Sequence, residues 1–430
     1  MEQLLHYVWK HKLFPLSPLT TTWHQAVEVI DPGLHNRNAG PDFFNAKIKL
    51  NGTLWVGNVE IHDKASDWYV HGHDKDERYD NVILHVCGTI DVEAKNSKGE
   101  PLVQLQLDIP ENVSKHYQEL LSIDQYPPCY QIIPSLTRLT VHSWMSALQT
   151  ERLSQKTDAI EARVKQCNGD WENAYFVTLA RNYGFGINGD TFEQWAYQLP
   201  LRAVDHHRDD LFQIEAIFLG QAGLLELNTI PERYQKDALN DGYFSRLKNE
   251  YLYLSHKFSL QPMDYKQWRF LRLRPQNFPH IRISQLANLY YNRRAGLSQL
   301  LEASTVKEAK QVLSTSVTEY WETHYTFGST SIRNEKHLSP FSLNLLIINT
   351  VLPILFAYGR HRGEEKYCDR AFDFLEELKA ENNHIVRMWK ECGLPVENAG
   401  DSQALIQLKK EYCDRKECLR CRIGYEYLKR

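Results

Sequence analysis

Two carboxylates and a histidine near the N-terminus have the types and the spacing of a metal-binding site. Asp42 precedes one strand-like run of alternating apolar and polar residues, and Glu60 and His62 lie at the end of the next. The Asn51-Gly52 pair between the two runs is the strongest short signal for a tight hairpin turn. Such a hairpin brings Asp42 and Glu60 to one end of the ladder, where their oxygens could hold Mg²⁺ or Mn²⁺. The alternative is an ordinary hairpin with carboxylates on its surface.

Histidines gather after the second run. Four of them fall within 24 residues, namely His62, His71, His73 and His85. Histidine supplies acid, base or metal-ligand chemistry near neutral pH. A second hypothesis therefore places a softer ion, Zn²⁺ or Mn²⁺, on His62, His71 and His73. His85 lies within an apolar run and is expected to be at least half buried, as a core histidine would be.

The acidic residues resemble the active-site pattern of the PD-(D/E)XK nucleases. In that family a Pro-Asp pair begins one strand and Glu-x-Lys lies on the next, and here Pro41 precedes Asp42 and His62 follows Glu60 by two residues. The resemblance implies that Asp42 and Glu60 hold Mg²⁺ or Mn²⁺ for the hydrolysis of phosphodiester bonds. The chain departs from the pattern at the lysine, whose role of orienting the attacking water would pass to His62 or Lys64.

The elements of that family's core are also expected in this chain. The core is an α-β-β-β-α-β unit with a mixed sheet. Alternation and the Asn51-Gly52 turn predict the strands over residues 43–50 and 54–61. The resemblance then implies a preceding helix over 2–14, a first strand over 25–30, a following helix over 65–80 and a further strand over 82–86.

The chain as a whole is similar to an uncharacterised bacterial family, a domain-of-unknown-function group of about this length. The resemblance rests on residues 38–43, 57–62, 272–279 and 348–353 and on the C-terminal cysteines. It implies no established activity, so the function has to be argued from the residues.

The sequence pattern changes near residue 110. Strand-like alternation dominates before it, and apolar residues spaced by three and four dominate after it. Helices are expected over residues 137–164, 170–183, 191–199 and 209–225. We therefore predict an α+β fold, in which residues 1–110 form a PD-(D/E)XK-like mixed sheet with flanking helices and residues 111–430 form a mainly helical region.

Composition limits the class of protein. The chain has 430 residues, of which 42% are hydrophobic, so it can build large cores, and its net charge of −4 gives no overall attraction to nucleic acid. Residues 1–14 carry several charges and no apolar stretch of signal-peptide length. The longest apolar run, 345–358, is interrupted by polar residues and a proline and is shorter than a membrane span. We therefore expect a cytoplasmic protein with no membrane partner.

A segment in the second half of the chain combines basic and aromatic residues. Residues 266–294 contain no acidic side chain, and aromatic residues are interleaved with the basic ones, which are Lys266, Arg269, Arg272, Arg274, Arg282, Arg293 and Arg294. Arginine can clamp phosphates and aromatic rings can stack on bases, so nucleic acid is the expected partner. We expect the contacts from Arg269, Arg272, Arg274 and Arg282. The alternative is a buried connector whose arginines tie acidic helices together.

Three cysteines near the C-terminus have the spacing of metal ligands. Cys413, Cys418 and Cys421 fall within nine residues, which favours thiolates around one metal centre over disulfides in a cytoplasmic protein. Either a zinc site or an iron–sulfur cluster needs a fourth ligand. The candidates for it are Cys129 first and then Cys368 and Cys392.

The cysteine arrangement loosely resembles that of PD-(D/E)XK nucleases of the recombination and CRISPR-adaptation type. Those proteins hold an iron–sulfur cluster with one distant cysteine and a C-terminal group of three, although their usual spacing differs. Basic neighbours are expected to lower the thiol pKa values, namely Arg415, Lys416, Arg420 and Arg422. Reduced structural thiols are the alternative.

Together these patterns predict a metal-dependent, nuclease-like protein that hydrolyses phosphodiester bonds of DNA or RNA. The alternative is an inactive nucleic-acid-binding or scaffold protein with a structural metal site. A third hypothesis is a small-molecule hydrolase built on the histidines. The acids discriminate between the first two, because only an active nuclease requires Asp42 and Glu60.

Overall fold

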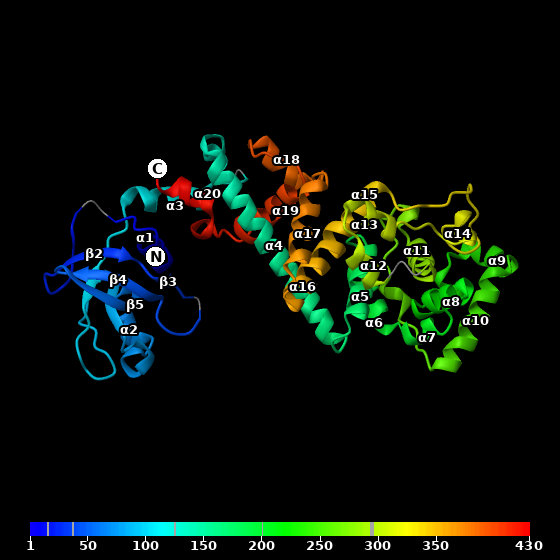
Figure 1. Ribbon diagram of the computed structural model, residues 1–430, viewed down its shortest axis with the longest axis horizontal. Coiled ribbons are helices and arrows are strands. Elements are labelled where there is room, and N and C mark those ends of the chain that lie inside the picture. The colour runs from blue at the N-terminus through cyan, green and yellow to red at the C-terminus, as the bar shows by residue number, and fades with distance from the viewer. Residues whose placement is uncertain (15–16, 37, 124–125, 200, 293–295) are drawn as a thin grey trace. The chain divides into compact units, whose positions relative to one another are not determined.

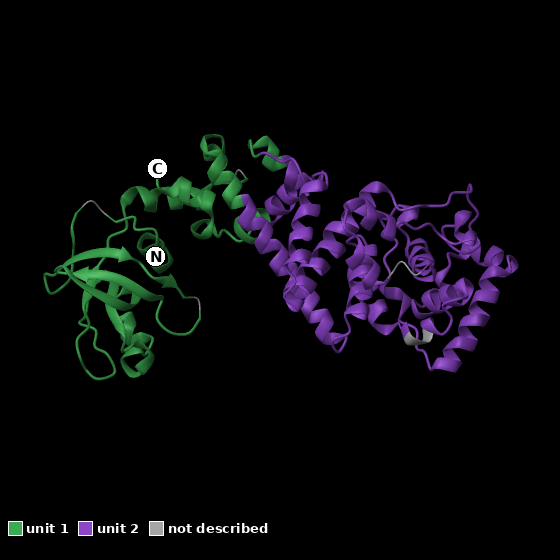
Figure 2. Ribbon diagram, in the orientation of Figure 1, with its two compact units in different colours: residues 1–144, 388–394, 408–430 green, residues 145–387, 395–407 purple. Residues whose placement is uncertain are grey.

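The computed structural model describes residues 1–430 with the exception of residues 15–16, 37, 124–125, 200 and 293–295. The chain forms two compact units, coloured separately in Figure 2. The first unit contains residues 1–144, 388–394 and 408–430, and the second contains residues 145–387 and 395–407. The fold is α+β, as predicted. The division differs from the boundary predicted at residue 110, because residues 111–144 and the C-terminal segment belong to the same unit as the sheet.

The first unit contains a seven-stranded mixed sheet (Figure 1). Its order is β1-β2-β4-β5-β6-β7, with β3 paired to β4 outside this path. The pairs up to β5 are antiparallel, whereas β5–β6 and β6–β7 are parallel. Thr21, beside β1, bridges Leu105 of β7, so the sheet is nearly closed. The strands are β1 (Leu19–Thr20), β2 (Ala26–Asp31), β3 (Leu34–His35), β4 (Phe43–Leu50), β5 (Thr53–Lys64), β6 (Val82–Thr89) and β7 (Gln104–Gln106).

Strands β4 and β5 form the predicted hairpin. Leu50 pairs with Thr53 across the turn. Asn51 and Gly52 both have positive φ, 50° and 85°, as a type I′ turn requires. The sequence signal therefore predicted both the position and the type of this turn.

A bulge interrupts the same hairpin farther from the turn. The register shifts by one residue between Phe43 and Ala46. Asn45, inside the bulge, has a φ of 55°, a left-handed conformation that asparagine tolerates better than most residues. The backbone N–H of Asn45 donates to Asn58 Oδ1 at 3.3 Å, which ties the bulge to β5.

The connection from β5 to β6 consists of short turns, and the single helix predicted over residues 65–80 is wrong. Gly72, with a φ of 74°, ends the first turn, and the extended Asp76 separates the next two. Trp68 and Tyr79 from this connection share a small core with Val82. The three turns are α2 (Asp67–Val70), η1 (His73–Lys75) and η2 (Glu77–Tyr79).

Helix α1 (Glu2–Lys10) packs against the sheet and is shorter than the predicted 2–14. It buries Leu5, Val8 and Trp9, whose indole N–H donates to the Pro32 carbonyl oxygen at 3.0 Å. Its opposite end carries Glu2 and His6, one helical turn apart on one face.

The remaining elements of the first unit are short and helical. Tyr427, near the C-terminus, donates its hydroxyl to Glu119 Oε2 at 3.3 Å, and Asn112 donates to the Arg430 carbonyl oxygen at 3.2 Å. These contacts dock the end of the chain on α3. The elements are α3 (Glu111–Ser122), η3 (Tyr130–Ser135), the π-helical η8 (Leu408–Cys413), η9 (Cys418–Arg420) and α20 (Arg422–Leu428).

The second unit is helical around one large apolar core. The four helices predicted there correspond to α4, α5, α6 and α8. Helix α11 is buried along most of its length. The helices from α4 onward are α4 (Arg138–Gln166), α5 (Trp171–Tyr183), α6 (Gly189–Gln198), α7 (Leu201–Asp205), α8 (Leu211–Gln221), α9 (Glu232–Asn240), α10 (Tyr243–Phe258), α11 (Pro279–Tyr291), α12 (Leu297–Glu302), α13 (Val306–Leu313), α14 (Glu319–Glu322), α15 (Pro340–Leu346), α16 (Leu352–Arg362), α17 (Glu365–Glu377), α18 (His384–Glu391) and α19 (Ala399–Gln407). The 3₁₀ turns are η4 (Leu227–Thr229), η5 (Tyr265–Gln267) and η6 (Pro275–Asn277).

The longest apolar segment is one continuous helix, contrary to the prediction that it is too short to span a membrane. Helices α15 and α16 join through the π-helical η7 (Ile347–Val351), so the helix runs over Pro340–Arg362, 23 residues. By length and composition it could cross a bilayer, but 61% of its most apolar window is buried within the protein. That burial is typical of a core helix.

Candidate metal centre

Asp42 and Glu60 lie side by side where β4 begins and β5 passes it. The backbone N–H of Asp42 donates to Glu60 Oε2 at 2.9 Å, and the backbone N–H of Ile61 donates to Asp42 Oδ2 at 2.9 Å. Glu60 is buried at 5% exposure, whereas 24% of the Asp42 side chain is exposed. The structure therefore brings the two predicted carboxylates together and leaves Asp42 the more accessible of the two.

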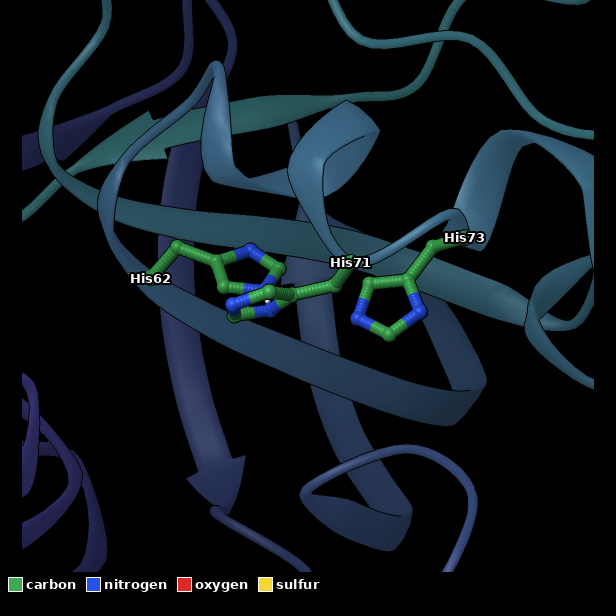
Figure 3. Close-up of side chains that lie close together, drawn as sticks. All are labelled: His62, His71 and His73. Atoms are coloured by element: carbon green, nitrogen blue, oxygen red, sulfur yellow. Dashed lines mark hydrogen bonds between the residues drawn. The ribbon is translucent and has the colours of Figure 1, made fainter.

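Three histidines gather beside Glu60. One ring nitrogen from each of His62, His71 and His73 lies within 4.8 Å of the other two, and Figure 3 shows the three rings close together. His62 Nε2 is 3.1 Å from His71 Nδ1. Glu60 Oε1 is 3.2 Å from His73 Nε2 and 3.7 Å from His62 Nε2. Three imidazoles and one carboxylate thus converge on one place.

Local geometry explains how these side chains meet. His62 follows Glu60 by two positions on β5, so both side chains point to one face of the sheet. His71 and His73 flank Gly72, whose left-handed backbone turns the chain between α2 and η1. His62 and His73 are buried, whereas His71 is exposed, so the group is accessible to solvent on the His71 side.

A second layer of side chains holds the histidine rings. His62 Nδ1 lies 2.9 Å from His85 Nε2, and the Gln104 amide nitrogen lies 3.4 Å from His85 Nδ1. His85 and Gln104 come from β6 and β7, which pair in parallel at these two residues. Tyr79 stacks on His73, with ring centroids 3.8 Å apart. A ligand histidine usually has such a partner for its second nitrogen, because the partner sets the orientation of the ring.

Helix α1 adds Glu2, which the sequence offered as an outer carboxylate, and His6, which the sequence prediction did not select. His6 Nε2 lies 3.5 Å from Asp42 Oδ2. The carboxyl group of Glu2 has a raised pKa, because it is partly buried and lies near Asp63, with a smaller effect from Glu60. The spacing of Glu2 and His6, four residues apart on a predicted helix, was the available signal.

Burial keeps His62, His85 and His6 neutral. Desolvation, followed by the neighbouring histidines, lowers the pKa of His62 to about 2, and desolvation lowers those of His85 and His6 to about 4. Burial and the Glu60 carboxylate raise the pKa of Asp42 above its usual range. Neutral imidazole is the form that binds a metal ion. The group is therefore short of positive charge, which a divalent cation would supply.

Lys64 is not part of this group. Its side chain is exposed at the end of β5 and acts on Asp91, whose pKa it helps to lower. Its backbone N–H donates to Asp67 Oδ2 at 3.0 Å. Of the two residues predicted to replace the lysine of the nuclease pattern, His62 lies in this group and Lys64 lies outside it.

The four predicted cysteine ligands line a cavity elsewhere in the first unit. Cys129, Cys413, Cys418 and Cys421 all line one cavity of about 380 Å³. The alternative fourth ligands do not line it: Cys368 lies on α17 and Cys392 follows α18.

The pKa values of these thiols are raised overall, contrary to the expected effect of basic neighbours, although Lys416 acts to lower that of Cys418. Burial raises the pKa of all four, and the neighbouring sulfurs raise those of Cys129 and Cys413 further. Arg415 and Arg420 instead pair with Glu411 and Glu417. Their charges are therefore directed to carboxylates.

The arginines predicted to bind nucleic acid have different environments. Arg269, Arg272 and Arg274 are exposed, whereas Arg282 is buried on α11. The Arg282 guanidinium donates to Gln285 Oε1 at 2.8 Å and to Asn277 Oδ1 at 2.6 Å, and it lies over the Phe185 ring. The prediction that Arg282 contacts nucleic acid is therefore wrong, because its side chain is packed inside the second unit. Arg293 and Arg294 lie outside the described residues.

Comparison with known sequences places the chain in a family. A family model described as "Protein of unknown function (DUF2851)" matches residues 2–384. The chain belongs to this family. The matched range includes the whole histidine and carboxylate group and Cys129, and it ends before Cys413. No curated protein and no solved structure was found to match the chain.

Proposed function

We propose that this protein is a metal-dependent hydrolase of phosphodiester bonds, with its ion held by His62, His71 and His73 beside Glu60. The position of Glu60 carries the proposal. One of its carboxylate oxygens lies 3.2 Å from His73 Nε2, and the other accepts the Asp42 N–H at 2.9 Å. Glu60 therefore joins the acidic pair and the histidines into one site.

The donor set determines which ion fits. Three imidazole nitrogens suit Zn²⁺ and Mn²⁺, whereas Mg²⁺ prefers oxygen ligands. The proposal therefore takes Mn²⁺ or Zn²⁺ in place of the Mg²⁺ expected from the carboxylates alone. Such an ion, when bound, polarises a phosphodiester and lowers the pKa of a bound water.

The protein's own residues have distinct roles in this proposal. His62 and His73 are buried and oriented by His85 and Tyr79, so they hold the ion in a fixed place. Asp42 is partly exposed and lies 3.5 Å from His6, so it is placed to orient an attacking water or accept its proton.

The order of the elements supports phosphodiester hydrolysis. Helix α1, the antiparallel strands β2, β4 and β5, the turns after β5 and the parallel strand β6 follow one another as in the PD-(D/E)XK core. Asp42 comes directly before β4 and Glu60 lies on β5, in the order in which the acids follow one another in that family, and His62 follows Glu60 at the position of the family's lysine.

The exposed arginines of the second unit support nucleic acid as the substrate. Arg269, Arg272 and Arg274 come from a segment without acidic residues and are exposed to solvent. Guanidinium groups bind phosphates in bidentate fashion. The other candidate, an inactive nucleic-acid-binding scaffold, shares these arginines and differs only in having no need of Glu60.

Metal binding is tested by titrating the metal-free, full-length chain with Mn²⁺, which thiolates bind less readily than they bind softer ions. We expect one strong site. Replacing one donor, in His73→Ala, should weaken it at least about tenfold. His142→Ala, at an exposed position on α4, is the matched control and should bind as the wild type does. Unchanged affinity in His73→Ala would contradict the proposed site.

Cleavage is tested on single- and double-stranded DNA and RNA, and on a small phosphodiester, with Mn²⁺, Zn²⁺ or Mg²⁺ and with chelator. Glu60→Gln should lower the rate about a thousandfold, since a charged group beside the ion is lost. Glu28→Gln, at an exposed carboxylate of β2, should leave it unchanged. Cleavage that persists in Glu60→Gln places the activity elsewhere. Salt-sensitive binding without cleavage under any ion would favour the scaffold.

A further inference from the structure

Four thiols from separate stretches of chain line the same cavity. Cys129 precedes η3, Cys413 ends η8, Cys418 begins η9 and Cys421 precedes α20. None of them forms a disulfide. Cys129 lies about 280 residues before the other three in the sequence, so the tertiary fold is what brings it to the same cavity.

The four thiols lie close together at a partly closed place. Cys129 and Cys421 are buried, at 8% and 7% exposure, and Cys413 and Cys418 are half-buried. After burial, the main cause of the raised pKa of Cys129 is the proximity of Cys421, Cys413 and Cys418. A metal centre between them would displace the thiol protons and compensate the charge of the four sulfurs.

N–H groups that suit a thiolate surround Cys421. The backbone N–H groups of Ile423 and Gly424 lower its pKa, and so does the Trp144 side chain. The Trp144 indole nitrogen is buried and has no other hydrogen-bond partner. Donors of this kind support metal-bound sulfur and tune the centre.

The turn that carries two of the cysteines is closely folded. A Cβ atom on Gly424 would lie 2.1 Å from the Cys418 carbonyl oxygen, so only glycine fits there. The peptide following Cys421 is thereby held against Cys418. This close approach packs the start of α20 against the turn that carries Cys418.

The distances between the sulfurs distinguish a single zinc ion from an iron–sulfur cluster. A single tetrahedral Zn²⁺, with Zn–S bonds of about 2.3 Å, would hold its sulfurs roughly 3.8 Å apart. Among the described residues, no three of these sulfurs lie within 4.8 Å of one another, whereas the nitrogens of the three histidines do. A wider set suits an iron–sulfur cluster, in which each thiolate binds a different iron.

We infer that Cys129, Cys413, Cys418 and Cys421 bind one iron–sulfur cluster of the four-iron class. The cluster ties the C-terminal segment to the turn before η3 within the first unit. It is independent of the proposed hydrolytic site, because its ligands and its metal are different.

The test uses the full-length chain purified without oxygen. We expect about four iron and four acid-labile sulfide per chain, with a broad visible absorption that reductant bleaches. Iron bound at the histidine site would carry no acid-labile sulfide, so the sulfide content distinguishes the cluster from such iron. One zinc per chain bound by these thiols, with no iron or sulfide, would overturn the inference.

Variants then assign the ligands. Cys129→Ser should lose most of the iron and sulfide, whereas Cys392→Ser and Cys368→Ser should keep both. Circular dichroism of each variant shows whether the chain has folded. If Cys129→Ser is unfolded, the wild-type iron and sulfide content still decides the matter. A folded Cys129→Ser with the full content would exclude Cys129 and the four-thiol site.

Discussion

Asp42 and Glu60 face each other across the β4–β5 ladder, with the Asp42 N–H bonded to Glu60 Oε2 at 2.9 Å. The turn at the other end of the hairpin does not by itself produce this relationship. In the register that starts at the turn, Asp42 would lie opposite Ile61, and its side chain would be on the other face from Glu60. The bulge at Asn45 shifts the register by one residue and turns Asp42 toward Glu60.

Insertion of one glycine after Asn45 should therefore weaken the metal centre without removing any of its side chains. The extra residue moves Asp42 opposite Ile61, so its side chain lies on the other face of the sheet from Glu60. We expect Mn²⁺ affinity to fall by about ten- to a hundredfold in isothermal titration, as for the loss of an outer partner of a ligand. Deletion of Asn45 removes the bulge but keeps Asp42 opposite Glu60, so this variant should bind as the wild type does. Equal affinity in the insertion variant would disprove the role of the register.

His85 should act on the metal through His62, as a positioning residue. It lies 2.9 Å from His62 Nδ1 and is fully buried. His85→Leu removes that partner and should weaken Mn²⁺ binding about ten- to a hundredfold. His85→Gln, which can still hydrogen-bond to His62, should recover part of the affinity, whereas a merely space-filling role would make leucine the better replacement.

The arginines of the second unit should separate into a structural and a binding group. Arg282→Ala leaves Gln285 and Asn277 without their buried donor, and we expect the free energy of unfolding to fall by on the order of 2–3 kcal/mol. The exposed Arg269→Ala and Arg274→Ala should change stability by less than about 0.5 kcal/mol. Each should instead lower the salt dependence of nucleic-acid binding by about one phosphate contact. Denaturant unfolding and binding across a salt series measure the two effects. A stable Arg282→Ala with weakened binding would contradict this division.

His280 should make the second unit sensitive to acid. It is fully buried, neither ring nitrogen has a partner, and burial lowers its pKa from 6.5 to about 3. Between about pH 6.5 and pH 3, His280 is therefore protonated in the unfolded chain but not in the folded chain. The free energy of unfolding consequently falls as the pH drops through this range. His280→Leu removes this contribution. Unfolding measured at pH 7 and pH 5 should show a smaller loss in the variant than in the wild type, and an equal loss would show that His280 does not titrate in this way.

Local patterns were sufficient for much of the sheet. Alternation and the Asn51-Gly52 pair predicted the β4–β5 hairpin, since a type I′ turn requires residues that tolerate positive φ. The helix that the nuclease resemblance implied over residues 65–80 was wrong. Gly72 and the extended Asp76 break that segment into turns, which place His71 beside His62 and His73 beside Glu60.

The sequence by itself determined which side chains are available for chemistry: an acidic pair, a dense run of histidines and a set of cysteines. Tertiary structure alone decided which of them meet. The Asn45 bulge, the parallel pairing that places His85 behind His62, and the docking that brings Cys129 to the C-terminal thiols all join residues distant in sequence. Local propensity carries no information on such contacts, because they depend on register and on packing between elements.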